Sequence, residues 1–367
     1  MGQVSLSPSA TAALAAAAAA RARHWLLYGP AQLRCGEQAG GIAGQVGAGG
    51  EPSYIYAEIT GYFLHWLADI ATEQTPAARQ AALGIGAWVR RQLAGARLPP
   101  TRIHLDPQAA PDWRNDALFF FDLAMLLRGL SSAQALDLVH LSEGELAHLI
   151  GALASFVGPD GELAAVRRRE PGPPLPQRWS TQGGAFLVKA SAAVHLAGRR
   201  LQLPLALQRA HAALLAGFAD GIAELPLRLL HPTLYFAEGM LVAMPARATA
   251  IASLLDRCLR LVDAAGELPE SEDEGGALGR NDLLAQALRL GLLLRGDQVP
   301  GAPSAETLQI LAGVLSERVG EGGGLAFCRR DAAAGANVWC TLFAEQALRW
   351  YARSAAGQPL PPASALV

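Results

Sequence analysis

The chain has 367 residues, of which 51% are hydrophobic and 17% are charged, and its 30 basic and 32 acidic side chains leave a net charge of −2. This composition supplies a large hydrophobic core and too few charges for a disordered chain. The balanced charge excludes a general attraction to nucleic acid or to an anionic membrane surface. The length suits either two or three ordinary domains or one large repetitive domain.

The cysteines and the N-terminus predict the compartment. The four cysteines form no CxxC pair and have no regular spacing, so we expect neither a zinc knuckle nor a disulfide framework. The alanine-rich N-terminus lacks a basic leader and predicts a helix capped near Ser7 or Ser9 rather than a signal peptide. No run of about 18 strongly apolar residues predicts a membrane span. We therefore expect a cytoplasmic protein.

Helical periodicity, broken by proline and glycine, predicts twelve helices along the chain. In chain order they span Ser9–Tyr28, Tyr54–Thr72, Pro76–Gly95, Asn115–Leu130, Ser142–Val157, Thr181–Gly198, Pro204–Asp220, Pro232–Val242, Pro245–Ala265, Asn281–Arg295, Ser304–Gly320 and Asn337–Ala355. They form six consecutive pairs, and the second members begin every 50 to 65 residues or so, a spacing of about one helical hairpin per repeat.

The second helix of each pair is generally richer in aromatic and apolar residues than the first. We therefore predict an all-α fold, an (α/α)6 toroid of six helical hairpins in a single domain spanning residues 1–367, with the second helices inside. An open solenoid is the alternative, because the sequence does not show ring closure. Three loops before inner helices, GPDGEL, DAAGELPE and GEGGGLAF, predict short β-turn lids at one end of the ring.

Polar side chains recur in lines on these apolar inner helices. On the helix predicted from Tyr54, the residues Glu58, Tyr62, His65 and Asp69 follow one another on one face. Comparable lines comprise His231, Tyr235 and Glu238, then Asp282, Gln286 and Arg289, then Asn337, Thr341 and Glu345. These lines either face a shared polar cavity at one mouth of the ring or hydrogen-bond between neighbouring helices and fix their alignment.

The polar lines suggest two kinds of chemistry. Two carboxylates across a cleft can act on a glycosidic bond, and a carboxyl group buried among apolar residues stays protonated and can serve as the acid. A tyrosine or histidine beside a carboxylate can instead abstract the proton alpha to a uronate, as in a lyase or a C5-epimerase. The candidate catalytic residues are Glu58, Asp122, Glu238, His231 and Tyr235.

Aromatic and polar residues near the expected mouth are candidates for binding a sugar, which stacks on aromatic faces. The candidate binding residues are Tyr54, Tyr56, Tyr62, His65, Trp179, Gln182, Lys189, Arg280, Asp282, Gln286, Asn337, Trp339 and Glu345. Ordinary aromatic core is the competing interpretation. The sequence contains no HExxH, Walker, GxSxG or helix-opening GxGxxG motif, and its histidines lack ligand spacing, so we expect neither a metal nor a cofactor. The DxDD acid of terpene cyclases is also absent.

Six segments in the order of the inner helices resemble a known motif series. They are YAEITGYF (Tyr56–Phe63), FFDLAMLLRGL (Phe120–Leu130), RWSTQGGAFLVKASAAV (Arg178–Val194), HPTLYFAEGML (His231–Leu241), RNDLLAQALRLG (Arg280–Gly291) and NVWCTLFAEQALRWY (Asn337–Tyr351). The series is similar to that of bacterial (α/α)6-toroid proteins often encoded with surface-polysaccharide biosynthesis enzymes. One departure is Ala57, where proline is common in the family.

The resemblance implies a fold shared with six-hairpin glycosidases, toroid lyases and glucuronyl C5-epimerases, a superfamily that hosts many reactions. We therefore expect a carbohydrate-active enzyme that acts on a polysaccharide precursor or oligosaccharide by hydrolysis, elimination or epimerisation. The alternatives are a glycan-binding or scaffold protein without catalytic activity, and a toroid that processes isoprenoids.

Overall fold

The computed structural model describes residues 7–70, 76–94, 98–106, 108, 113–172, 174–272 and 279–367. The chain divides into two compact units, each with its own core. Unit I comprises Leu27–Asp220 together with Val367, and unit II comprises Met1–Leu26 together with Gly221–Leu366. Two of the expected helix ends, Thr72 and Gly95, lie outside the described residues.

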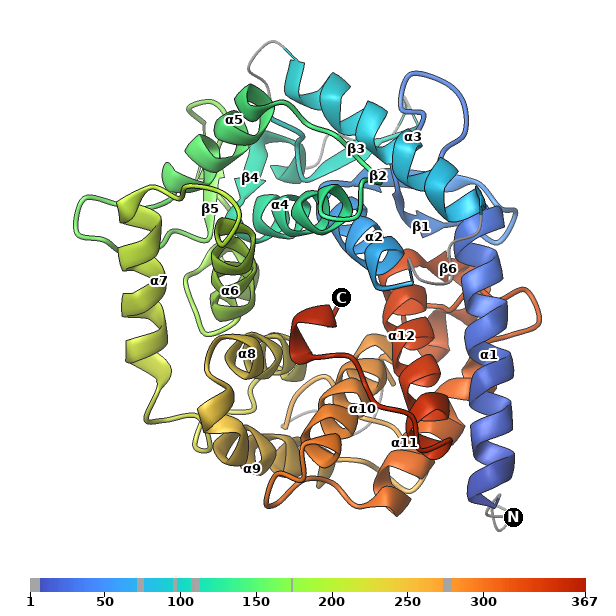
Figure 1. The fold of residues 1–367 in the computed structure, drawn as a ribbon. Helices are drawn as coiled ribbons and strands as arrows, with labels where there is room; N and C mark the ends of the chain where they lie inside the picture. Colours follow the sequence, from blue (N-terminus) through green and yellow to red (C-terminus); the bar gives the residue numbers. More distant parts are fainter. Residues whose placement is uncertain are drawn as a thin grey trace. The chain divides into compact units, whose positions relative to one another are not determined.

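Unit I contains two layers of helices (Figure 1). Its buried layer consists of α2 (Ala57–Asp69), α4 (Phe120–Gln134) and α6 (Leu187–Gly198). Its outer layer consists of α3 (Pro76–Leu93), α5 (Glu143–Ala154) and α7 (Leu205–Phe218). Nearly every residue of α2 and α4 is buried, whereas α3 and α5 bury one face each. The second helices of the predicted pairs are therefore the buried ones in this unit, as expected.

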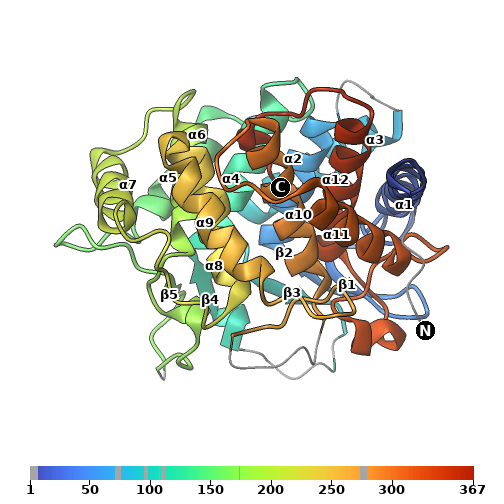
Figure 2. The same ribbon diagram turned by 90° about the horizontal axis from the view of Figure 1, so that it is seen from below.

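Short strands precede the buried helices of unit I. The strands β1 (Ala43–Val46), β2 (Pro52–Tyr56) and β3 (Arg102–His104) pair in antiparallel order, and β4 (Ala117–Phe119) pairs with β5 (Val166–Arg168). The strand β2 leads directly into α2, and β4 leads directly into α4. In Figure 2 the strands β3, β4 and β5 lie at one end of the helices of this unit.

Three predicted helix starts were wrong. The residues before α2 form β2, those before α4 form the 3₁₀ helix η3 (Trp113–Asp116) and β4, and those before α6 include the 3₁₀ helix η4 (Trp179–Thr181). In β2 the cause is pairing, since Tyr54 and Tyr56 face His104 and Arg102 across the sheet. Aromatic residues favour such pairing, and tertiary contacts of this kind override helical periodicity.

Unit II repeats the layered arrangement. Its buried helices are α8 (Leu230–Ala243), α10 (Asn281–Gly296) and α12 (Val338–Ala355), and its outer helices are α9 (Ala248–Leu259), α11 (Ala305–Arg318) and most of α1 (Pro8–Tyr28). Its short elements are β6 (Ala336–Asn337) and the 3₁₀ helices η5 (Pro245–Arg247), η6 (Arg329–Ala334) and η7 (Ala363–Ala365).

The first helix of the chain contacts the last hairpin. Arg21 of α1 donates hydrogen bonds to the carbonyl oxygens of Val319 and Gly320 at 3.0 and 3.2 Å, directly after the C-terminal end of α11. Arg23 forms an ion pair with Glu345 of α12 at 2.8 Å. An open solenoid has no such contact between its first and last repeats, so this packing favours the toroid over the alternative.

The three predicted lids are turns, as expected from their glycines. Gly161, Gly266 and Gly323 adopt positive φ angles of 83°, 76° and 82°, a conformation that glycine adopts without steric cost. In the first two turns the residue that opens the turn bonds to the carbonyl oxygen four residues later, as Gly158 bonds to Glu162 at 2.9 Å. No helix that the structure describes is long and apolar enough to span a membrane.

Glycines allow α2 and α4 to pack with their backbones almost touching. A Cβ atom added at Gly61 would lie 2.4 Å from the backbone of Met125, and one added at Gly129 would lie 2.2 Å from the carbonyl oxygen of Gly61. Any larger residue at these positions would therefore push the two helices apart. The close contact also places the first turns of α2 and α4 side by side.

We predict that Gly61→Ala lowers the free energy of unfolding by about 2 to 3 kcal/mol, because the methyl group overpacks the contact between α2 and α4. Gly151→Ala is the matched control, since a Cβ atom at this exposed position of α5 meets no atom within 4 Å. It should gain about 0.5 to 1 kcal/mol from reduced backbone freedom. Urea unfolding measures both changes, and similar values for the two variants would contradict the packing described.

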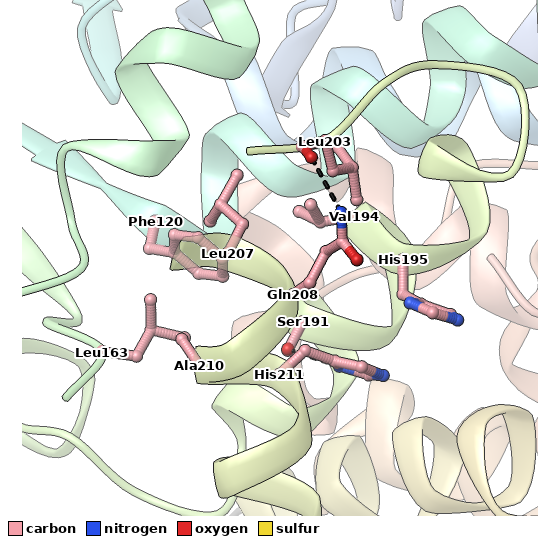
Figure 3. A pocket seen from close by; sticks show the side chains of 10 residues that line it. All are labelled: Phe120, Leu163, Ser191, Val194, His195, Leu203, Leu207, Gln208, Ala210 and His211. Atoms are coloured by element: carbon pink, nitrogen blue, oxygen red, sulfur yellow. Dashed lines mark hydrogen bonds between the residues drawn. The ribbon is translucent and has the colours of Figure 1, made fainter. Parts of the chain in front are cut away.

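A small cavity with a mainly apolar lining lies between α6 and α7 of unit I (Figure 3). Its volume of ≈ 10 Å³ is close to the space that one water molecule needs. His211 lies at its edge, where its Nδ1 atom is 2.7 Å from Ser191 Oγ and its ring stacks on His195 at a centroid distance of 4.6 Å. Burial, and then the neighbouring His195, lower the pKa of His211 to about 4.

We predict that unit I loses stability on acidification because of His211. An unfolded histidine titrates near pH 6.5, so the unfolded chain binds more protons than the folded chain between about pH 6.5 and pH 4. The contribution of His211 is therefore complete above that range and is lost as the pH falls through it, by at most about 3 kcal/mol before solvent screening. Urea midpoints measured from pH 7.5 to 4.5 give the slope.

The control for this prediction is a pair of variants. His211→Gln should flatten the slope, whereas His140→Gln, at a side chain that is 70% exposed, should leave it unchanged. Identical slopes in both variants and in the wild type would contradict the assignment to His211.

Candidate functional site

The candidate residues fall into both units, and each unit forms its own polar cluster. In unit I, Glu58 of α2 and Asp122 of α4 occupy the first turns of their helices. Gly61 follows Glu58 by three residues, and Met125 follows Asp122 by three residues. Gly61 and Met125 are in contact. The two carboxyl groups therefore lie at the same level of the helix pair. Only 8% of Glu58 and 4% of Asp122 is exposed, so water does little to separate their charges.

Asp122 occupies a site that disfavours its charged form. Burial raises the pKa of this carboxyl well above its usual range, and the charge of Glu58 raises it further. A hydrogen bond from Thr101 and the charge of Arg102 oppose the shift without reversing it. The Oδ2 atom is buried and makes no hydrogen bond to any residue that the structure describes. The site therefore favours the protonated form of Asp122, and one carboxyl oxygen has no partner among the described residues.

Tyr56, the last residue of β2, completes the pair. Burial raises the pKa of its phenol well above 10, and the charges of Asp122 and Glu58 and a hydrogen bond with Glu58 raise it further, against the opposing charge of Arg102. A phenol held protonated in this way suits donation of a hydrogen bond or proton more than abstraction of one. We call Glu58, Asp122, Tyr56, Thr101 and Arg102 the carboxylate cluster.

Two residues of β3 beside this cluster were not among the sequence candidates. Arg102 lies opposite Tyr56 in the sheet, and His104 lies opposite Tyr54. The guanidinium of Arg102 lies 4.4 Å from the Tyr54 ring centroid and 5.5 Å from that of Tyr56. The alternation of polar and apolar residues in TRIHL is a strand signal that could have placed both residues on one face.

The other candidates on α2 contact neighbouring helices. Nδ1 of His65 lies 2.8 Å from Ser132 Oγ, and its Nε2 lies 3.1 Å from Arg128, both on α4. The Nζ atom of Lys189 lies 4.9 Å from the Tyr62 ring centroid and donates to the carbonyl oxygen of Val367 at 3.1 Å. His65 thus links α2 to α4, and its role in binding a substrate remains a prediction.

Trp179 and Gln182 lie in the loop before α6. Trp179 is 39% exposed, and its ring meets that of Phe186 edge to face at 5.1 Å. Phe186 in turn lies 6.0 Å from Phe121, the neighbour of Asp122. Gln182 is exposed, and its backbone N–H donates to Arg178. Trp179 therefore presents an open aromatic face connected through phenylalanines to the residue beside Asp122.

Unit II forms a second cluster, which we call the histidine cluster. Asp282 of α10 accepts hydrogen bonds from Arg280 at 2.6 and 3.0 Å and from the indole of Trp339 at 3.5 Å. His231 of α8 places its Nδ1 atom 3.2 Å from Asp282 Oδ2 and 3.0 Å from Gln286 Oε1. Both neighbours of Nδ1 are acceptors, so Nδ1 carries the proton and Nε2 carries the lone pair in the neutral ring.

The pKa of Asp282 is shifted in the opposite direction from that of Asp122. Burial alone would raise its pKa, but the charges of Arg280 and His231 and hydrogen bonds from Arg280 and Trp339 hold the pKa below its ordinary value. The ring of Tyr235 packs on His231 at a centroid distance of 4.2 Å. The Nε2 atom of Gln286 is buried without a partner among the described residues. In this cluster Asp282, held by Arg280, contacts Nδ1 of His231 and orients its ring.

Three further candidates of unit II have structural partners. Glu238 forms an ion pair with Arg289 at 2.7 Å, and both side chains are almost completely buried. Glu345 pairs with Arg23 at 2.8 Å and Arg349 at 3.0 Å. Asn337 caps α12 by accepting a hydrogen bond from the backbone of Cys340 at 3.0 Å. Each role contributes to stability, and a part in catalysis or binding stays a prediction for these residues.

Comparisons with known proteins place the fold. No protein-family model matches the sequence, and a search of curated proteins gives no match. Among solved structures, cellobiose 2-epimerase from Spirochaeta thermophila DSM 6192 matches with a TM-score of 0.66 and 14% identity, over 95% of this chain and 98% of that one. A D-mannose isomerase matches with a TM-score of 0.64 and 12% identity, over 93% and 97% of the two chains.

The type II terpene cyclase MstE from Scytonema matches with a TM-score of 0.56 and 13% identity, over 94% of this chain and 99% of the cyclase. At such low identity these similarities establish the fold alone. The protein is an all-α (α/α)6 toroid with short turns before the buried helices, as its sequence predicts. Among the described residues, no three histidine, cysteine or acidic side chains are placed to hold a metal ion.

We predict that Glu238→Gln lowers the free energy of unfolding by about 3 to 5 kcal/mol, because it removes the charge of a carboxylate that is ion-paired with the completely buried Arg289. Asp256→Asn is the control, since Asp256 and Arg260 form an ion pair at 2.7 Å with side chains 50% and 77% exposed. That variant should lose no more than about 1 kcal/mol. Thermal and urea unfolding give both values, and a fully stable Glu238→Gln protein would contradict a structural role for the pair.

Proposed function

We propose that the protein is an enzyme that acts on an oligosaccharide or polysaccharide precursor by acid–base chemistry at the carboxylate cluster of unit I. The observation that supports this proposal most directly is the pair of buried carboxyl groups, Glu58 and Asp122, of which Asp122 has an oxygen without a hydrogen bond to the described residues. A carboxyl group kept protonated near neutral pH is what a general acid requires.

In the proposed mechanism each group of the cluster has its own role. Asp122 donates its proton to a sugar oxygen, and Glu58 serves as the base that accepts a proton or as the carboxylate that stabilises positive charge. The phenol of Tyr56 donates a hydrogen bond to Glu58 and orients it. Hydrolysis, elimination and epimerisation all need one group that delivers a proton and one that removes a proton or stabilises charge, so the cluster suits any of the three.

A carbohydrate is the favoured substrate because aromatic rings occur near the carboxyl groups. Tyr54 and Tyr56 lie 6.2 Å apart in β2, and Trp179 exposes its indole on the neighbouring loop. Sugars stack on such faces while their hydroxyl groups bond to carboxylates. The names of two similar folds, cellobiose 2-epimerase and D-mannose isomerase, support the same class, although one fold hosts many reactions.

The histidine cluster of unit II supports a second catalytic role. His231, fixed by Asp282 and Gln286, has the arrangement of a general base that removes a proton from carbon or oxygen. Such a base fits elimination or epimerisation, whereas the carboxyl pair fits hydrolysis equally well. We propose that both clusters belong to one (α/α)6 domain, and this proposal extends to residues 1–367.

Two alternatives make different predictions. A glycan-binding protein without catalytic activity would bind sugars and give no product. An isoprenoid-processing toroid, the activity class of the similar MstE fold, would need a hydrocarbon-lined site, whereas Arg102, Glu58 and Asp282 are charged or titratable groups. For the compartment we propose the cytoplasm, because the four described cysteines are free thiols.

We predict that Asp122→Asn and Glu58→Gln each lower turnover by about 10²- to 10⁴-fold on whichever member of a disaccharide and uronate-oligosaccharide panel the wild type converts. Asp122→Asn should at the same time be as stable as the wild type at pH 7, or more stable by about 0.5 to 2 kcal/mol. The raised pKa means that the folded wild type loses stability as the pH rises from about 3.9 through the folded pKa. Asparagine does not titrate, so the Asp122→Asn protein does not lose stability in this way as the pH rises.

Product detection by mass spectrometry and urea unfolding at pH 5 and pH 7 measure the two effects separately. Ser155→Ala, at a surface position after α5, is the control for the effects of mutagenesis and purification. Its turnover and its stability should both stay near the wild-type values. A stable Asp122→Asn protein with full turnover would contradict the proposed acid, and panel binding without any product would favour the glycan-binding alternative.

A further inference from the structure

Two basic side chains at the carboxylate cluster, Arg102 of the cluster and the adjacent His104, each have one buried nitrogen without a hydrogen bond to the described residues. The Nε atom of Arg102 and the Nε2 atom of His104 are buried and bond to no residue that the structure describes. Buried polar atoms in native proteins almost always have a partner, so an exception calls for an explanation such as a bound ligand. The Asp122 Oδ2 atom is a third exception in the same neighbourhood.

The strand β3 places the side chains of Arg102 and His104 together beside Tyr54. Arg102 and His104 are two residues apart in β3, so their side chains project from the same face of the sheet. Both contact Tyr54, since the guanidinium lies 4.4 Å and the His104 ring 5.7 Å from the Tyr54 ring centroid. The tyrosine ring holds both side chains without consuming their N–H groups, which leaves those groups for a ligand.

The charges around Arg102 favour the binding of an anion. Arg102 interacts electrostatically with Asp122 and with Tyr56, and burial raises the pKa of both groups, which disfavours their charged forms. No salt bridge joins Arg102 to an acidic side chain among the residues that the structure describes. A half-buried guanidinium without a paired anion is unfavourable, and the planar donors of arginine match carboxylate and phosphate oxygens.

We propose that Arg102 and His104, supported by Tyr54, form an anion subsite that binds a carboxylate or phosphate group carried by the sugar substrate. The inference rests on the proposed function, because the subsite borders Asp122 and Glu58 and would hold an acidic sugar against them. It narrows the substrate class to sugars that carry a negative charge. The charged group is either the carboxylate of a uronate or the phosphate of a sugar phosphate.

The test compares matched ligands on the full-length protein. Glucuronate and glucose form one pair of probes, and glucose 1-phosphate and glucose form the other, with binding measured by ligand-detected NMR. We expect the wild type to bind one charged member of these pairs in preference to glucose, with an affinity that falls as salt is added. Glucuronate binding identifies the carboxylate as the source, and glucose 1-phosphate binding identifies the phosphate.

The variants separate the subsite from general surface charge. Arg102→Met should weaken binding of the preferred charged sugar by about ten- to hundredfold, and Arg102→Lys should retain part of it. Arg114→Met is the matched control, because Arg114 also lies over an aromatic ring, 4.7 Å from the Trp113 centroid. Its affinity should equal that of the wild type. Circular dichroism verifies folding, and the Arg102→Lys protein keeps the test valid if Arg102→Met unfolds.

Asp122→Asn distinguishes this inference from the proposed function. Charged-sugar binding that depends on Arg102 and survives in Asp122→Asn supports the subsite, even if no variant or wild-type protein shows turnover. Equal affinity for charged and neutral probes, or wild-type affinity in both Arg102 variants, overturns the subsite and leaves the acid–base proposal standing. Binding of neither charged probe by the wild type also overturns it.

Discussion

The arrangement of unit I depends on the close contact between α2 and α4. Because Gly61 has no side chain, its backbone meets that of Met125, and the two helices begin at the same level. The first turns then bring Glu58 and Asp122 together out of water, where two negative charges cannot both be stabilised. This close packing of the helices therefore accounts for the raised pKa of Asp122.

The same residue types behave differently in unit II because of their partners. Asp282 is as deeply buried as Asp122, yet two hydrogen bonds from Arg280 keep it charged. Glu238 and Glu345 likewise face arginines on neighbouring helices. Asp282, Glu238 and Glu345 each accept a hydrogen bond from an arginine, whereas none of the described arginines donates one to Asp122.

The sequence predicted the helices and their layers well, because hydrophobic periodicity is a local property that survives into the folded state. It also identified Glu58, Asp122, His231 and Asp282 as polar residues on apolar helices. It did not predict that Tyr54 and Tyr56 belong to a strand, since Tyr54 pairs with His104, which lies 50 residues further along the chain. The local alternation in TRIHL could have placed Arg102 and His104 on a strand, but not beside Tyr54 and Tyr56.

The ion partners of Glu238 and Glu345 were also beyond the reach of the sequence. Arg289 lies 51 positions from Glu238 along the chain, and Arg23 lies 322 positions from Glu345. Spacing along one helix describes which residues share a face, but not which face of another helix they meet. The packing of α1 on the last hairpin is a further contact of this long-range kind.

The most direct measurement is the titration of the Asp122 carboxyl carbon by ¹³C NMR in the wild type and in Glu58→Gln. The account predicts a pKa well above the ordinary range of aspartate in the wild type, and a lower pKa once the Glu58 charge is removed. An Asp122 that titrates as an ordinary exposed aspartate, or whose pKa is unaffected by Glu58→Gln, would contradict the account.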